Sequence, residues 1–175
     1  ITIEEREAAD YDKVAVEKRM AYKKNVNEGG GCPSSRAAAF ERRPQAAEPR
    51  EEIVSELKQW PCQIKLVPVN APYFEGAKLL IAADCTAFAN ANVHSRFMGG
   101  KITLIGCPKL DMVDYSDKLT EILKNNDIKS IEVLRMTVPC CGGIEYAVKQ
   151  ALQNSGKLIP WQVTVIAPNG EIVQG

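Results

Sequence analysis

Four of the six cysteines in this chain each follow an apolar, strand-like run of residues. These four thiols belong to Cys85, Cys107, Cys140 and Cys141. If the runs form neighbouring parallel strands, the thiols lie along one edge of one sheet, because right-handed crossovers bring the strand ends to the same side. Open α/β sheets bind their ligands outside that edge. Thiolate is the soft ligand that selects zinc or iron–sulfur clusters, so the pattern predicts a metal or cluster site.

The residues beside the thiols favour ligation of a bulky group. Pro108 and Pro139 restrict the backbone next to Cys107 and Cys140. Gly142 and Gly143 allow the chain to approach an inorganic cluster closely, and their amides can donate hydrogen bonds to sulfide. We therefore assign these two glycines to cofactor binding. Adjacent cysteines in an extended strand point to opposite faces, so both can ligate only if the strand ends at Pro139.

Several interpretations of the thiols stay open at this point. A four-iron cluster needs four thiolates, which this set can supply, and a structural zinc site is the second metal hypothesis. Cys140 could instead form a redox-active dithiol with Cys141 or Cys32. Inert packing is the remaining interpretation, because a free cysteine often behaves as a small buried hydrophobic residue.

Other polar residues are weaker candidates for the same site. Cys32, in a glycine-rich loop, could fold over the site as a further ligand or redox partner, and we include it among the cofactor-binding residues. Cys62 begins a predicted strand, at the wrong end for the site, and is interpreted as a packing residue. His94, the only histidine, could act as a ligand or proton carrier, or could be a capping or surface residue. Asp84 and Asp111 could accept hydrogen bonds near the thiols, and Lys101 and Lys109 could offset the charge of a cluster. Both pairs could equally be solvated residues at the rim.

The elements that must position these residues alternate between strand and helix. Strands are expected at 64–67, 79–84, 102–106, 130–136 and 162–167, the last pairing with 171–173 across a turn at 168–170. Helices are expected at 51–59, 87–97, 116–125 and 144–153. Cys85 and Cys107 are 22 positions apart, and Cys107 and Cys140 are 33 apart, which leaves room for a crossover helix each time. This pattern predicts a Rossmann-like α/β fold, a mostly parallel sheet with helices on both faces.

Composition divides the chain into two parts and excludes some functions. Residues 1–58 are charged, glycine-rich or proline-rich and are predicted to form an irregular or helical N-terminal arm and linker, followed by an α/β cysteine domain at 59–175. With 22 basic and 22 acidic residues the formal charge is zero, which gives no basis for binding nucleic acid or an anionic membrane. Without a membrane-spanning run or an export signal, sparse cysteines indicate a cytoplasmic protein.

Three cysteine-containing segments resemble a known family. They are 82–85 (AADC), 105–111 (IGCPKLD) and 138–143 (VPCCGG), with further likeness at 30–35 and 63–68. The likeness is to the C-terminal domain of 4Fe–4S ferredoxin-type iron–sulfur cluster-binding proteins of anaerobic bacteria and archaea. In that family a two-cluster ferredoxin domain normally comes first. Here residues 1–3 resemble the strand just after it, and the ferredoxin cysteines are absent from this chain.

The residues and the resemblance together give one leading hypothesis. We expect a 4Fe–4S cluster on Cys85, Cys107, Cys140 and Cys141, used for electron transfer with a redox partner protein or an attached ferredoxin domain. One alternative is a catalytic metal or cluster site with an open position that acts on a small molecule. The other is a structural zinc site in an interaction module.

Overall fold

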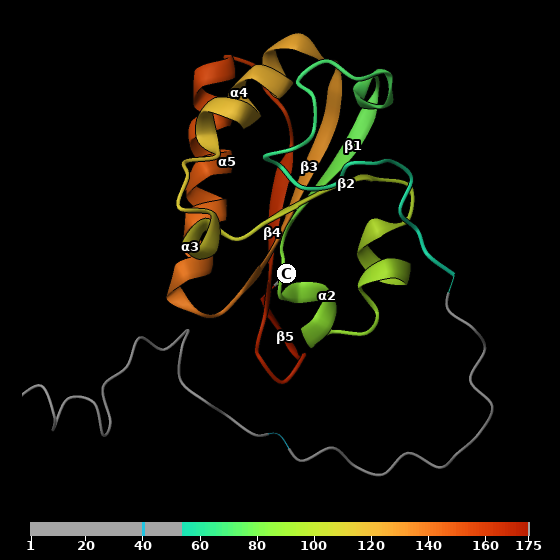
Figure 1. The fold of residues 1–175 in the computed structure, drawn as a ribbon, viewed down its shortest axis with the longest axis vertical. Helices are drawn as coiled ribbons and strands as arrows, with labels where there is room; N and C mark the ends of the chain where they lie inside the picture. Colours follow the sequence, from blue (N-terminus) through green and yellow to red (C-terminus); the bar gives the residue numbers. More distant parts are fainter. Residues whose placement is uncertain (1–39, 41–53, 175) are drawn as a thin grey trace, which may run out of the picture. The chain divides into compact units, whose positions relative to one another are not determined.

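The computed structural model describes residue 40 and residues 54–174, all within one compact unit of the chain. Its centre is a five-stranded sheet in the order β2-β1-β3-β4-β5 (Figure 1). The strands are β1 (Ala77–Ala83), β2 (Ile102–Gly106), β3 (Ile128–Met136), β4 (Trp161–Ile166) and β5 (Ile172–Gln174). The helical segments are η2 (Pro72–Phe74), α2 (Thr86–Ala89), η3 (His94–Met98), α3 (Pro108–Asp111), α4 (Ser116–Asn125), η4 (Pro139–Cys141) and α5 (Gly142–Ser155).

The sheet is parallel except at one edge. Strand β1 pairs with β2 on one side and with β3 on the other, and β3 pairs with β4, all in parallel. Strand β5 runs antiparallel to β4 after the turn that contains Gly170, whose φ of +93° suits glycine. The predicted Rossmann-like fold with a mostly parallel sheet is therefore confirmed, and so is the terminal pairing.

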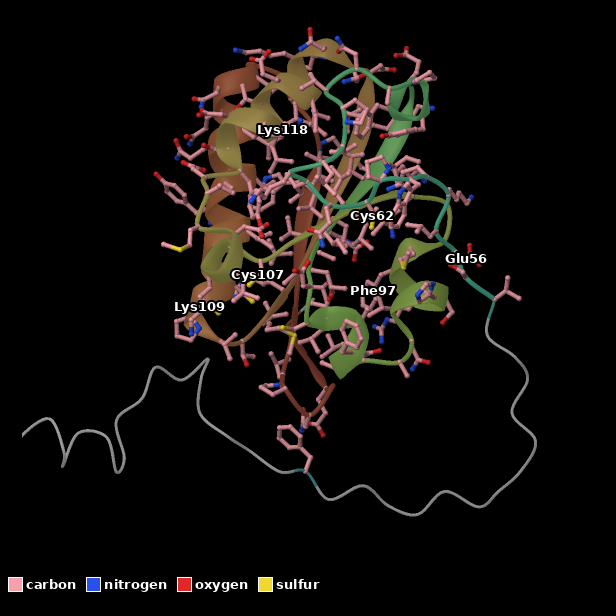
Figure 2. All side chains as sticks on the ribbon, viewed as in Figure 1. Glu56, Cys62, Phe97, Cys107, Lys109 and Lys118 are labelled. Atoms are coloured by element: carbon pink, nitrogen blue, oxygen red, sulfur yellow. The ribbon has the colours of Figure 1, made fainter. Side chains whose placement is uncertain are left out.

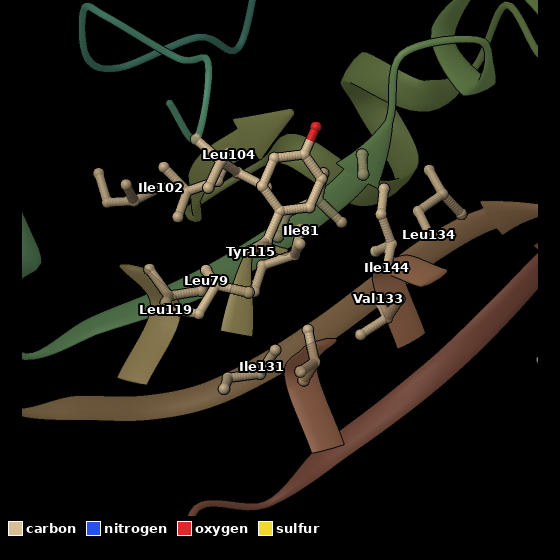
Figure 3. Close-up of a cluster of buried hydrophobic side chains, with 14 of the residues drawn as sticks. Leu79, Ile81, Ile102, Leu104, Tyr115, Leu119, Ile131, Val133, Leu134 and Ile144 are labelled. Atoms are coloured by element: carbon tan, nitrogen blue, oxygen red, sulfur yellow. The ribbon is translucent and has the colours of Figure 1, made fainter. Parts of the chain in front are cut away.

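Helices lie on both faces of this sheet, as predicted. The chain leaves β1 toward β2 and then returns past β1 to β3, so right-handed crossovers place the connecting helices on opposite faces. Figure 1 shows α4 and α5 together on one side and α2 on the other. The α4–α5 face carries most of the large apolar side chains. Figure 3 shows part of this cluster, including Leu79, Ile81, Leu104, Tyr115, Leu119, Ile131 and Ile144.

One predicted strand, 64–67, is wrong. Beyond the isolated bridge between Gln63 and Ile105, this segment is a turn. The amide of Val67 donates back to the Gln63 carbonyl at 3.0 Å, and the amide of Ile64 donates to the Ile105 carbonyl at 2.9 Å. Ile64 and Val67 are both buried although they are three residues apart, a spacing that fits a turn and not an alternating strand.

The predicted helix 87–97 is also wrong, because it is broken in two. Segment α2 ends at Ala89 and η3 begins at His94. Between them the Asn90 side chain accepts a hydrogen bond from the Asn92 amide at 2.9 Å, which is the local bond that lets asparagine compete with a helix. The Asn90 amide group also donates to the Gly170 carbonyl at 2.8 Å, so the break is tied to the turn before β5.

The other helix predictions have mixed outcomes. The helix at 116–125 matches α4 in both bounds, and 144–153 falls inside α5, which ends at Ser155 and is followed by Gly156 with φ +68°. Residues 54–58 contain no helix, so the part of the 51–59 prediction that the structure describes is wrong. Most of the predicted N-terminal arm at 1–58 lies outside the described residues.

Candidate thiol site

The strand order brings the three cysteine-bearing loops side by side. Cys85 lies just after β1, Cys107 follows the last residue of β2, and Cys140 with Cys141 forms η4 beyond the end of β3. Because β1 lies between β2 and β3, all four thiols come from neighbouring strand ends. The register also pairs Ala83 of β1 with Gly106 of β2, so the loops that carry Cys85 and Cys107 begin at the same level.

The four thiols are close enough to influence one another electrostatically. Burial raises the pKa of Cys85, and the neighbouring Cys107, Asp84 and Cys140 raise it further. Burial also raises the pKa of Cys141 to about 11, against a backbone hydrogen bond with Met136 that lowers it, while Cys140 and Cys85 add to the increase. The environment therefore favours the protonated thiol at Cys85 and Cys141, and ligation of a metal by either would require loss of that proton.

Packing fixes the position of the Cys107 loop against η4 and α5. A Cβ atom added at Gly143 would lie 3.0 Å from the Cβ of Pro108, so only glycine fits this approach without displacement. The Cys107 carbonyl accepts hydrogen bonds from the amides of Leu110 and Asp111 at 3.1 and 2.9 Å, which begin α3. Gly142, in contrast, has open space where a side chain would be. Close packing thus requires a glycine at position 143, whereas Gly142 has no packing role.

A half-buried acidic pair, Asp84 and Asp111, lies next to the thiols. The Tyr115 hydroxyl donates to Oδ2 of Asp111, and a Cβ atom added at Gly106 would meet that hydroxyl at 2.6 Å. Burial raises the pKa of Asp84, Asp111 raises it further, and a hydrogen bond with Gln63 acts in the opposite direction. Burial and the bond to Asp111 likewise raise the pKa of Tyr115. Sequence analysis missed Tyr115, for which the glycine at 106 was the one available signal.

Comparison with known proteins assigns the chain to a family. Residues 71–175 match the model of a Rossmann-like domain. The chain belongs to the Rossmann-like domain family. An uncharacterized protein of Archaeoglobus fulgidus is 34% identical over 120 residues, which cover 68% of this chain and 84% of that protein. No solved structure shows significant similarity to the chain.

In this Rossmann-like domain the thiols occupy the place where the fold binds its ligands. The strand order reverses next to β1, and ligands of such sheets bind at the carboxyl ends of the strands where it does so. Dinucleotide-binding members carry a glycine-rich G-x-G-x-x-G turn after the first strand. Here β1 is followed by Asp84, Cys85 and Thr86 instead. A thiol therefore stands where the phosphate-binding turn would be.

The remaining candidates are placed apart from this group. His94 accepts a hydrogen bond at Nδ1 from the Glu56 amide at 3.2 Å, and because residues 54–58 contain no helix, this bond is not a helix cap. Figure 2 shows Cys62 well separated from Cys107, and the Cys62 carbonyl bonds the Ile105 amide at 2.9 Å. The prediction that a lysine offsets charge near the thiols is wrong for Lys101, which precedes β2 at the opposite end of the strand and pairs with Glu132 at 2.8 Å. Lys109 lies in α3 directly after Cys107 and Pro108, and its role stays a prediction. Cys32 lies outside the described residues.

Within residues 54–174, no group of three histidine, cysteine, aspartate or glutamate side chains is arranged to hold a metal ion. A zinc ion would require its sulfur ligands to converge at about 2.3 Å from one point. Separately, none of the helices in the described part of the chain is long and apolar enough to cross a membrane.

Proposed function

We propose that this Rossmann-like domain binds a 4Fe–4S cluster through Cys85, Cys107, Cys140 and Cys141 and serves in electron transfer. The observation that carries the proposal is the meeting of three cysteine loops at adjacent strand ends, where neighbouring thiols contribute to the raised pKa of Cys85 and Cys141. A four-iron cluster requires four thiolate ligands, the number that these loops supply. The resemblance of the three cysteine segments to ferredoxin-type iron–sulfur proteins supports the same assignment.

Four thiolates suit either a four-iron cluster or a single structural zinc ion. The resemblance to iron–sulfur proteins is the reason to propose the cluster first, and metal and sulfide analysis separates the two groups.

The chain itself supplies the groups that would stabilise such a cluster. Cys141 is buried directly before α5, a helix of 14 residues, so the positive end of the helix faces the thiol region. Gly143 lies in the first turn of this helix, and its amide would donate to a sulfur acceptor when the cluster is bound. When bound, the cluster would store one electron at a potential set by burial and these hydrogen bonds.

A partner protein would reach the site from the side of Cys85, the exposed member of the set. The side chains of Phe88 and Met112, close in sequence to the thiols, are 93% and 87% exposed. Such apolar surface suits a redox partner or an attached ferredoxin module. A cytoplasmic location is part of this proposal, because reducing conditions keep the thiols free to ligate.

Anaerobic purification of the full chain tests the proposal. We expect iron and sulfide in a ratio near one to one, and an electron paramagnetic resonance signal after reduction with dithionite. Cys107→Ser should lose the iron, whereas the matched variant Cys62→Ser should keep it. Protein that holds zinc and no sulfide would support the structural zinc alternative. Protein that holds neither metal, even after anaerobic incubation with iron and sulfide, would refute metal binding.

A dithiol role is the second candidate, and one observation favours it. Cys140 and Cys141 are adjacent in η4, and the Cys140 side chain contributes to the raised pKa of Cys141, so the two thiols are neighbours. Oxidation by glutathione disulfide would join these sulfurs and release two molecules of glutathione. Mass spectrometry after alkylation in a glutathione redox buffer tests this. Alkylation of both cysteines at every redox potential, with Cys85 as the reference thiol, would argue against it.

A further inference from the structure

A cavity of about 190 Å³ lies on the α2 side of the sheet. Most of its lining is apolar and comes from β1, β2, α2, η3 and the chain before β1. The principal apolar residues are Leu57, Leu80, Ala82, Val93, Met98 and Ile105. Figure 2 labels Cys62 and Glu56 on this side of the sheet, and the Cys62 side chain also lines the cavity.

The local sequence explains why this space is not filled. A long crossover helix normally covers the face of a parallel sheet. Here the crossover is broken between Ala89 and His94, and α2 has only 4 residues. The break is held on both sides, by the Asn90 bond to Gly170 and by the Glu56 amide on His94. The cavity is thus a stable consequence of the fold.

One wall of the cavity carries a buried hydroxyl group without a partner. Thr103 is 3% exposed, and its Oγ1 makes no hydrogen bond to any residue that the structure describes. The backbone of Thr103 does have partners, because the Gln59 side chain accepts a hydrogen bond from the Thr103 amide and donates one to the Thr103 carbonyl. Leu104 packs on the α4–α5 face (Figure 3), so alternation along the strand directs Thr103 to the cavity side. A buried hydroxyl group without a partner is costly and points to a bound molecule.

A second oxygen without a partner lines the same cavity farther along. Oδ1 of Asp84 is buried and has no hydrogen-bond partner among the described residues. The register pairs Thr103 with Leu80, which is four residues before Asp84. At about 3.3 Å per residue, the two levels are roughly 13 Å apart along the strand. The cavity therefore runs from Thr103 toward the edge that carries Cys85.

We propose that this cavity binds a small, mostly apolar molecule about the size of one six-membered ring, with a hydroxyl group bound by Thr103. The size follows from volume, since an apolar protein cavity of about 150 Å³ accommodates benzene. The hydroxyl follows from chemistry, because the threonine hydroxyl both donates and accepts. This inference does not depend on the cluster, whose ligands lie outside the cavity lining.

Phenol and toluene serve as probes, because they share shape and differ in the hydroxyl group. We expect phenol to bind the full chain at millimolar concentration and more tightly than toluene, measured by amide chemical shifts in NMR. The largest shifts should fall on Leu80, Val93 and Thr103. Thr103→Val, which keeps the side-chain shape, should weaken phenol binding about five- to tenfold and leave toluene binding unchanged.

The control is Thr120→Val, at a buried threonine on α4 whose hydroxyl is bonded to the Ser116 carbonyl at 2.6 Å. It should not change binding of either probe. Equal affinity for phenol and toluene in the unsubstituted protein, or shifts confined to surface amides, would overturn the proposal without any variant. Phenol binding that persists in Cys107→Ser protein would show that the cavity and the proposed cluster are separate sites.

Discussion

The two faces of the sheet are built differently. One face is covered by α4 and α5, helices of 10 and 14 residues whose buried side chains pack onto the strands. The other is covered in part by α2 and η3, of 4 and 5 residues, with the cavity beneath them. Regular crossover helices provide stability through burial, whereas the interrupted crossover leaves space and polar groups that can bind a ligand.

The buried polar residues follow the same division. Thr103, Glu132 and Thr164 lie on the strands and are each less than 9% exposed. Glu132 pairs with Lys101 at 2.8 Å and accepts a hydrogen bond from Thr164 at 3.4 Å. Parallel strands buried on both faces are usually apolar throughout. Here only the α4–α5 face follows that rule, so the burial of apolar area on that face accounts for most of the stability.

The largest expected effect tests this division by truncating one side chain on each face. Leu104→Ala, at a residue with no exposure in the α4–α5 cluster, should lower the free energy of unfolding by about 3 kcal/mol. Met98→Ala, which borders the existing cavity, should cost about 1–2 kcal/mol because Met98 has fewer packing partners to lose. Urea denaturation measures both. Equal losses would contradict the idea that one face supplies most of the stability.

The second prediction concerns the ion pair between Lys101 and Glu132, on the face of the sheet opposite α4 and α5. Lys101→Met removes the partner of a carboxylate whose side chain is 10% exposed, and should cost about 2 kcal/mol. Adding Glu132→Gln should recover part of that loss, because the uncompensated buried charge is then gone. Lys124→Met is the control, since Lys124 and Glu121 are 48% and 55% exposed and their pairing contributes little. Failure of the double variant to recover stability would show that Glu132 is not buried as a charge.

The third prediction tests how closely the α4–α5 face is packed at the thiol end. Gly106→Ala should cost about 1–2 kcal/mol, because the new methyl group would press on the Tyr115 hydroxyl, 2.6 Å away. Gly142→Ala should be neutral or slightly stabilising, since it faces open space at the start of a helix. Thermal unfolding of both variants decides the matter. A neutral Gly106→Ala would mean that Tyr115 can move without loss.

Sequence patterns predicted the α4–α5 face far better than the other. The bounds of α4 and β2 matched the prediction because burial and the hydrophobic pattern agree there. The strand predicted at 64–67 failed because a four-residue run with three apolar residues fits either a strand or a turn. The continuous helix predicted at 87–97 failed because the break at Asn90 depends on a bond to Gly170, 80 residues away in the chain.

Some features of the candidate site could likewise be predicted from sequence, and others could not. Strand order was predictable, so the meeting of the cysteine loops followed from sequence alone. The partner of Tyr115 and the unpaired hydroxyl of Thr103 depend on which side chains meet in three dimensions, which no local pattern contains. The cavity was missed for the same reason, because it results from the break in the helix that the sequence pattern predicted at 87–97.

The smallest expected effect is a pH dependence on the α4–α5 side. Glu145 of α5 bonds Lys149 and Arg135, each at 2.8 Å. The Lys149 bond is the main cause that lowers the pKa of Glu145 in the folded protein, and Arg135 adds to it. The stabilisation is therefore complete above the ordinary carboxyl pKa of about 4.3 and is lost as the pH falls through the lowered value.

Glu145→Gln should therefore cost about 1 kcal/mol at pH 7 and progressively less as the pH is lowered below 4. Comparing urea midpoints of variant and parent at each pH removes the contribution of the other carboxyl groups. Glu121→Gln, at an exposed position of α4, is the control and should show no such trend. A cost that does not depend on pH would mean that Glu145 contributes by packing. The link between α5 and β3 would then be apolar, like the rest of that face.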